Sequence, residues 1–366
     1  MGLQVGIVGL PNVGKSTLFN AVSAAGAEAA NYPFATIEPN VGVVAVPDER
    51  LDHLVRLAGS AKRVPTSVEL LDIAGLVKGA SRGEGLGNQF LSHIREVDAV
   101  IHVVRCFEDP DIVHVDGSVD AVRDVEVIST ELLLKDLETV EKRVERSGKA
   151  ARTGDKAAAR GAEVAADLLR HLQSGAPARS AGGGEEGAGL CRELGLLTAK
   201  PMLYAANVGE ADLPEGDRNV HVEALRELAK RDDAEVVVIC AEAEAQIAEL
   251  APEERAEFLA DLGLQRSGLD KLVGAAYRLL GLITFFTAGP KEARAWTVRQ
   301  GTRAPRAAGE IHSDIERGFI RAEVIGYDDY ATLGSEQAVK DAGRLRVEGK
   351  DYVVRDGDVV HFRFNV

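Results

Sequence analysis

Short apolar runs alternate with longer stretches of helical spacing over the first 120 residues, and the alternation returns after residue 200. The apolar runs predict buried strands over residues 5–8, 41–46, 66–72, 99–105, 202–206 and 236–239. Because parallel strands are joined by helical crossovers, this order predicts an α/β fold with a parallel sheet covered on both faces.

The stretch from about residue 120 to residue 174 has a different pattern. Proline disappears, and apolar residues recur three and four positions apart, as at Leu133, Leu137 and Val140. The spacing predicts two long antiparallel helices joined by a turn at residues 153–155. Residues 173–189 are rich in glycine and serine, and we expect a mobile loop there.

Two helical segments, over residues 252–262 and 269–280, precede a change to short strands separated by glycine turns. Strands are predicted at residues 295–298, 320–324, 351–354 and 359–364, as in a small α+β domain. We therefore expect a nucleotide-binding domain over residues 1–119 and 200–281, a helical insertion over 120–199, and a C-terminal domain over 282–366.

The first strand is followed directly by Gly9-x-x-x-x-Gly14-Lys15-Ser16 and then by helical spacing. Strand, glycine loop and helix in this order are typical of a P-loop, whose backbone N–H groups surround a phosphate. Lys15 can reach the β- and γ-phosphates of a nucleotide, and the Ser16 hydroxyl can bind Mg²⁺. The predicted nucleotide-binding residues here are Asn12, Val13, Gly14, Lys15, Ser16 and Thr17.

Three residues farther along complete a switch of the kind that responds to a terminal phosphate. Asp72 ends a predicted strand and can hold Mg²⁺, Gly75 can donate its backbone N–H to the γ-phosphate, and Thr36 can bring a hydroxyl to the metal. Loops that touch only the terminal phosphate become ordered when it is present and relax when it leaves.

The base should be read by the segment after the late strand over residues 202–206. In switch GTPases this segment is Asn-Lys-x-Asp, whereas here it is Asn207-Val208-Gly209-Glu210. Without the lysine, and with a longer carboxylate, guanine selection should be weak, while Asn207 can pair with N6 and N7 of adenine. We therefore predict ATP as the ligand. Cys240 and Ala241, which follow the next strand, complete the predicted nucleotide site.

Composition narrows the partners. The net charge is −15, which argues against general coating of nucleic acid or of anionic membranes, and against sequence-specific DNA binding. The three cysteines lack a metal-binding spacing, and no apolar stretch is long enough to cross a bilayer, so we expect a cytoplasmic protein. One local exception is the basic hairpin tip, a candidate RNA contact unless it is only a solvated face. Its basic residues are Lys142, Arg143, Arg146, Lys149, Arg152, Lys156 and Arg160.

Eight segments of the chain together follow the pattern of a known family. They cover residues 9–17, 31–40, 72–80, 87–91, 102–107, 207–210, 285–289 and 349–358. Through them the chain closely resembles the YchF subfamily of Obg-like ATPases. The resemblance implies a Ras-like domain interrupted by a helical hairpin, a C-terminal TGS domain of β-grasp type, a preference for ATP over GTP, and association with ribosomes.

The resemblance also bears on catalysis. Ras-like enzymes carry a water-orienting glutamine after Asp-x-x-Gly, but Leu76 stands there, so hydrolysis should be slow. The family pattern suggests His114 as the stand-in, beside Lys15 and Gly75, unless it is a loop histidine without a role. Asn12 matches the position where related proteins bind K⁺. Ala35 replaces a cysteine of many relatives, so redox control through that thiol should be missing.

The first hypothesis is a Mg²⁺-dependent ATPase switch whose nucleotide state sets docking to the ribosome, in translation or in stress regulation. The alternative is an RNA- or ribosome-binding module in which the nucleotide is a structural ligand. A GTPase remains a third reading if Glu210 still recognises guanine.

Overall fold

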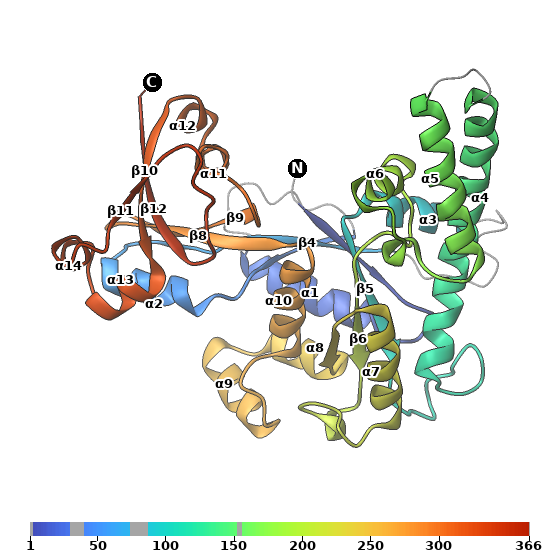
Figure 1. Ribbon diagram of the computed structural model, residues 1–366. Helices are drawn as coiled ribbons and strands as arrows, with labels where there is room; N and C mark the ends of the chain where they lie inside the picture. The colour runs from blue at the N-terminus through green and yellow to red at the C-terminus, as the bar shows by residue number, and fades with distance from the viewer. Residues whose placement is uncertain (1–2, 30–39, 74–86, 152–155, 366) are drawn as a thin grey trace. The chain divides into compact units, whose positions relative to one another are not determined.

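The computed structural model describes residues 3–29, 40–73, 87–151 and 156–365 (Figure 1). By its contacts the chain divides into two compact units. Among the described residues, 26–29, 43–68 and 273–365 form the second unit, and the others form the first. Each unit is built around a six-stranded sheet. This is the α/β fold class predicted from the alternation of apolar runs.

The first sheet has the strand order β2-β4-β1-β5-β6-β7, and the pairs β1–β4, β1–β5, β5–β6 and β6–β7 are parallel. Every residue of β5 and of β6 is buried, as expected for central strands of a covered parallel sheet. Its strands are β1 (Gln4–Val8), β2 (Val41–Ala45), β4 (Ser67–Asp72), β5 (Ala99–Arg105), β6 (Met202–Asn207) and β7 (Val236–Ile239).

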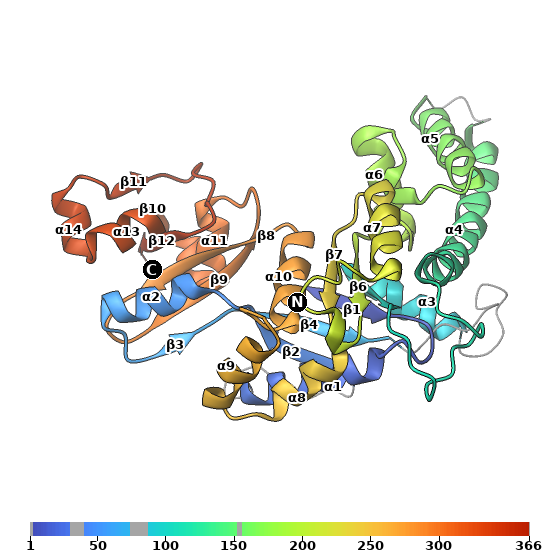
Figure 2. The same cartoon turned by 90° about the horizontal axis from the view of Figure 1, so that it is seen from below.

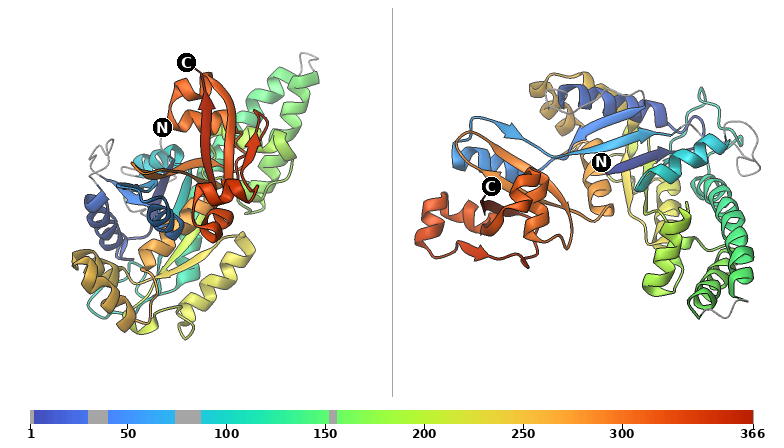
Figure 3. Two further views of the ribbon diagram at one scale, coloured as in Figure 1. Left: turned by 90° about the vertical axis from the view of Figure 1, so that its left-hand side faces the viewer. Right: turned by 90° about the horizontal axis from the view of Figure 1, so that it is seen from above.

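Helices lie on both sides of this sheet, with α1 on one side and α3, α4 and α7 on the other (Figures 2 and 3). The carboxyl ends of β1, β5, β6 and β7 meet at one edge, where α/β proteins bind ligands. The helices of the first unit are α3 (Gly87–Glu96), α4 (Ala121–Ala151), α5 (Lys156–Gln173), α6 (Gly184–Leu194), α7 (Val220–Asp232), α8 (Ala241–Glu249) and α9 (Pro252–Asp261), with 3₁₀ turns at Ala178–Ser180 and Glu210–Asp212. Helices α1 (Lys15–Ala29) and α10 (Gly268–Leu279) begin in the first unit and end in the second.

The predicted helical hairpin consists of α4 and α5, which lie side by side (Figure 3). Its expected turn at residues 153–155 lies outside the described residues. The hairpin is tied to the chain that returns to β6 through Asp136, which is fully buried. Its carboxylate accepts the backbone N–H groups of Leu197 and Thr198, each at 2.8 Å, and the Thr198 hydroxyl at 2.6 Å. No described helix is both long and apolar enough to cross a bilayer.

The expected mobile loop over residues 173–189 was wrong. A 3₁₀ turn forms at Ala178–Ser180, and α6 follows. The glycine content favours a loop, but two features of this segment favour a helix more strongly. Acidic residues occupy the first turn of α6, where they complement the helix dipole, and Leu190 and Cys191 are buried in the hairpin core.

The second sheet has the order β11-β10-β12-β8-β9-β3. The expected strand over residues 351–354 is wrong, since only an isolated bridge joins Val353 to Arg303. The elements of this unit are α2 (Glu49–Ala58), β3 (Arg63–Val64), β8 (Leu282–Ala288), β9 (Ala293–Arg299), α11 (Ala304–Ile311), α12 (Ser313–Arg317), β10 (Phe319–Gly326), α13 (Tyr327–Leu333), α14 (Glu336–Asp341), β11 (Arg346–Glu348) and β12 (Asp358–Phe364).

By their contacts, residues 43–68, which we had expected in the nucleotide-binding domain, group with the C-terminal strands, although β2 and β4 at the two ends of this range are strands of the first sheet. The reason is that β3 pairs with β9, and that α2 packs its buried Leu51 and Leu54 against Phe286 and Val359. Helix α2 begins after the N-cap Asp48, which accepts the N–H of Arg50.

Acidification should weaken the fold through His102 on β5. Burial lowers the pKa of His102 from 6.5 to about 3. Between these values the unfolded chain binds a proton that the folded chain refuses, so stability falls as the pH falls, by at most about 1.4 kcal/mol per pH unit. When urea unfolding is measured from pH 7 to pH 4, the free energy of unfolding should fall less steeply with pH in His102→Phe than in the unaltered chain. Equal slopes would assign the acid sensitivity to other groups.

Candidate nucleotide site

The P-loop lies between the buried strand β1 and helix α1. Two of its residues adopt positive φ, Asn12 at 63° and Gly14 at 90°. Asparagine and glycine are the residue types that tolerate this conformation best, so the loop can turn its N–H groups inward without a large strain. The Leu18 N–H donates to Gly14 O at 3.0 Å and starts the helix directly behind the loop.

Asn207, at the end of β6, ties this loop to the start of α8. Its Nδ2 donates to Val13 O and its Oδ1 accepts from Ala241 N, both at 2.9 Å, and its side chain is buried. These two bonds use one N–H and one lone pair of the Asn207 amide, and its oxygen keeps a second lone pair, so pairing of Asn207 with adenine stays a prediction. One Nδ2–H remains for a ligand.

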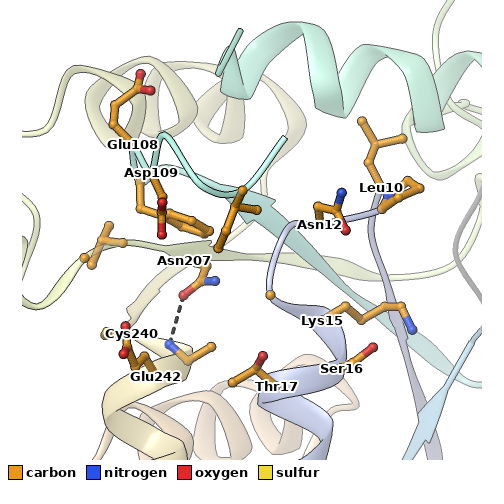
Figure 4. A pocket seen from close by; sticks show the side chains of 17 residues that line it. Leu10, Asn12, Lys15, Ser16, Thr17, Glu108, Asp109, Asn207, Cys240 and Glu242 are labelled. Carbon is orange, nitrogen blue, oxygen red and sulfur yellow. Dashed lines mark hydrogen bonds between the residues drawn. The ribbon is translucent and has the colours of Figure 1, made fainter. Parts of the chain in front are cut away.

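Loop and strand ends enclose a cavity of about 1000 Å³ (Figure 4). Lys15 lies at one side, and the carboxylates of Glu108, Asp109 and Glu242 lie across from it. A ligand with an anionic end and a neutral end that carries hydrogen-bond donors fits this polarity. Of the residues predicted for the nucleotide, the cavity is lined by Asn12, Gly14, Lys15, Ser16, Thr17, Asn207, Val208, Cys240 and Ala241.

Two of the predicted residues behave differently from the others. Val13 contributes its carbonyl to Asn207 and is buried behind the loop. Glu210 is exposed in the 3₁₀ turn after β6, and its carboxylate accepts from Gln246 at 3.5 Å. Burial raises the pKa of the Cys240 thiol, so this residue faces the cavity as a neutral thiol.

The ammonium of Lys15 forms an ion pair with Asp72 at the end of β4. The carboxylate therefore already holds a cation beside the P-loop. With the Ser16 hydroxyl it supplies the hard oxygen donors that Mg²⁺ prefers, and this ion commonly takes only one or two protein ligands beside phosphates and water. The donor set thus fits Mg²⁺. No cluster of three or more acidic, His or Cys side chains suited to a metal occurs among the residues that the structure describes.

Arg105, which sequence reasoning missed, organises the wall of the cavity beyond β5. Its side chain is 1% exposed, and its guanidinium donates to the carbonyls of Phe107, Asp109 and Ile112 at 3.0–3.3 Å. It also lies 4.5 Å from the centre of the Phe107 ring. A buried arginine after a strand is a poor sequence signal, because the carbonyls it binds carry no side-chain signature.

His114 lies in the same loop but does not line the cavity. It is 7% exposed, and its Nε2 lies 2.8 Å from Asp124 on α4. Its Nδ1 accepts from Asp116 N at 3.1 Å, so Nε2 carries the proton that Asp124 accepts. Both ring nitrogens are engaged, and the imidazole has no free acceptor for a water. The loop is held to the P-loop by Asn12, whose Nδ2 donates to Val113 O at 3.0 Å.

Thr36, Gly75, Leu76 and Ala35 lie outside the described residues.

At the hairpin tip, the charge count from the sequence overlooked acidic neighbours. Lys142 pairs with Glu138, and Arg143 pairs with Glu193 of α6. Arg160 pairs with Glu163 and Glu186.

Two family models match the chain. One, described as a 50S ribosome-binding GTPase, matches residues 4–140, and one named YchF-GTPase_C, described as a protein of unknown function, matches residues 282–365. Curated relatives match from end to end. The "Ribosome-binding ATPase YchF" of Bacillus subtilis is 57% identical and that of Escherichia coli O157:H7 is 52% identical, each over 100% of both chains.

Solved structures agree. The Schizosaccharomyces pombe YchF GTPase has a TM-score of 0.90 and 39% identity, with 99% of this chain and 98% of that chain covered. A GTP-binding protein from Pyrococcus horikoshii OT3, with a TM-score of 0.59 and 21% identity over 99% and 100% of the two chains, shares the fold.

Proposed function

The chain belongs to the YchF family, and we propose that it is a Mg²⁺-dependent ATPase switch that hydrolyses ATP to ADP and phosphate and binds ribosomes in the cytoplasm. The observation that carries the proposal is the cavity lined by Lys15, Ser16 and Asn207, with Asp72 paired to Lys15. The names of the bacterial relatives support both the ATPase activity and the ribosome binding.

In this proposal Lys15 exchanges its partner when nucleotide binds. Its ammonium leaves Asp72 and reaches the β- and γ-phosphates, and Asp72 and Ser16 are then free to hold Mg²⁺. The metal, when bound, supplies positive charge against the phosphate oxygens. Thr36 and Gly75 would contact the terminal phosphate, and release of that phosphate after hydrolysis would relax both of their loops. Asn12 is the candidate K⁺ ligand, through its amide oxygen, since its nitrogen is bound to Val113.

A preference for ATP over GTP is supported by the missing lysine and by Glu210 in place of aspartate. We expect unlabelled ATP to displace bound fluorescent ATP at lower concentration than GTP does. Glu210→Asp shortens the side chain to the length found in GTPases. It should bring the displacing concentrations of ATP and GTP closer together. Tighter binding of GTP by the unaltered chain would overturn the adenine preference.

Hydrolysis should depend on His114, although its imidazole must first leave Asp124 to meet a water. His114→Ala should lower kcat by about 10²- to 10⁴-fold, the usual range for a lost acid–base group, while the Kd for ATP stays the same. Asp124→Asn is the matched variant. Since a neutral acceptor binds the imidazole less strongly, it should leave turnover equal or raised. Unchanged kcat in His114→Ala would remove His114 from the mechanism.

The basic hairpin tip is the proposed RNA contact. Several of its charges are partly balanced by glutamates, so the test reverses positions for which the described part of the hairpin shows no ion pair. Reversing Arg146 and Lys156 together should weaken co-sedimentation with ribosomes, whereas reversal of Arg170 and its partner Asp167 on α5 serves as a charge-neutral control. Equal pelleting of all three chains would make the tip a solvated face.

A further inference from the structure

A loop beside the cavity exposes three aliphatic side chains close together. Ile112 is 38% exposed, Val113 74% and Val115 52%. Single exposed aliphatic residues are common, but three within four positions on one loop form a small apolar patch. Burial of this patch against a partner would stabilise the complex. We call these three side chains the apolar loop surface.

The loop that carries this surface is held firmly from within. Arg105 binds the carbonyl of Ile112, and Asn12 binds the carbonyl of Val113. His114, between Val113 and Val115, is anchored to Asp124. The backbone is therefore fixed while the aliphatic side chains point outward. A surface ordered before binding loses little entropy when a partner docks, which favours recognition.

The charge around the surface selects the partner. Residues 106–122 contain five acidic residues and no lysine or arginine. Of these, Glu108, Asp111 and Asp120 are exposed. An acidic rim repels RNA phosphates and attracts lysine and arginine, so the complementary partner is a basic protein segment with an apolar side chain at its centre.

We propose that the apolar loop surface docks a basic segment of a ribosomal protein. The inference rests on the proposed ribosome binding and adds a contact of opposite charge to that of the hairpin tip. Proteins that share a particle with RNA carry excess lysine and arginine, because they neutralise phosphates. Since Ile112 also lines the nucleotide cavity, a partner seated here would touch the wall of the nucleotide site.

Photo-crosslinking identifies the partner class. A benzophenone amino acid replaces Val113 in the full chain, which is mixed with purified bacterial ribosomes and a non-hydrolysable ATP analogue, then irradiated. The same amino acid at Val220, which is 69% exposed on α7, is the control. We expect a protease-sensitive crosslink to a ribosomal protein from position 113 only. A crosslink to rRNA alone, or equal crosslinks from both positions, would overturn the proposal.

Substitution then tests the energetics. The double variant Val113→Thr/Val115→Thr keeps side-chain shape but replaces a methyl with a hydroxyl at each site, and should bind ribosomes about 10-fold more weakly. Val220→Thr should bind as the unaltered chain does. Asp111→Lys should also weaken binding, and stronger binding would indicate RNA and contradict the inference. Thermal unfolding of each variant checks that it is folded.

The outcomes separate the two levels of inference. If the unaltered chain does not pellet with ribosomes, the proposed ribosome binding and this docking site both fail. If the unaltered chain and the double threonine variant pellet equally, the docking site alone fails.

Discussion

Gly14→Ala should weaken ATP binding by about 100-fold or more. A Cβ at this position would lie 2.1 Å from Asn207 Nδ2, and the backbone φ of 90° disfavours any L side chain. Left-handed backbone costs roughly 1–2 kcal/mol, and a lost buried hydrogen bond of Asn207 costs about 1–3 kcal/mol more. Each 1.4 kcal/mol corresponds to a factor of ten in Kd, so the two costs together correspond to a loss of affinity of about 100-fold or more. Isothermal titration with ATP and Mg²⁺ measures it.

Gly161→Ala is the matched control, since nothing lies within 4 Å of a Cβ there and α5 accepts alanine readily. It should bind ATP as the unaltered chain does and unfold at an equal or slightly higher temperature. If Gly14→Ala binds ATP normally, the tie between Asn207 and Val13 does not shape the phosphate loop.

Arg105→Met should destabilise the first unit by about 3–5 kcal/mol, the range found when one partner of a buried charged contact is removed. The backbone carbonyls of Phe107, Asp109 and Ile112 would lose the hydrogen-bond donor that Arg105 now supplies. The wall itself should loosen, so KM for ATP should rise in the fraction that stays folded. Urea unfolding and steady-state kinetics measure the two effects.

Arg170→Met controls for loss of an arginine, because this side chain is 76% exposed and pairs only at the surface with Asp167. Its unfolding free energy should change by less than about 1 kcal/mol. A similarly small change in Arg105→Met would mean that the loop carbonyls find other donors. Arg105→Lys should recover part of the stability, since one ammonium can still reach one or two of these carbonyls.

The sheet and the P-loop followed from periodicity because their signals are local. A β-branched run between glycine turns specifies a buried strand wherever it packs, and glycine spacing specifies the phosphate loop. The lining of the cavity by Lys15, Ser16, Asn207 and Cys240 follows in turn, since carboxyl ends of neighbouring parallel strands meet at one edge.

What the sequence hid depends on partners distant along the chain. The sequence predicts a base-recognition role for Asn207, but it does not show that the same amide also binds Val13 and Ala241. His114 reads as a free loop histidine until Asp124 is found beside it. In contrast, α2 was visible in principle, because Asp48 precedes apolar spacing at Leu51 and Leu54 and Gly59 closes the helix in a left-handed conformation.

Because α2 packs against the C-terminal strands, its apolar face depends on the order in which the chain is made. Leu51 and Leu54 leave the ribosome early in synthesis, yet Phe286 and Val359, against which they pack, are added near its end. For most of translation this helix has no native apolar partner from the C-terminal strands, and exposed apolar segments of nascent chains attract chaperones and misassembly. A protein released before Val359 is added would expose that face permanently, so quality control of incomplete chains can act on residues 49–58.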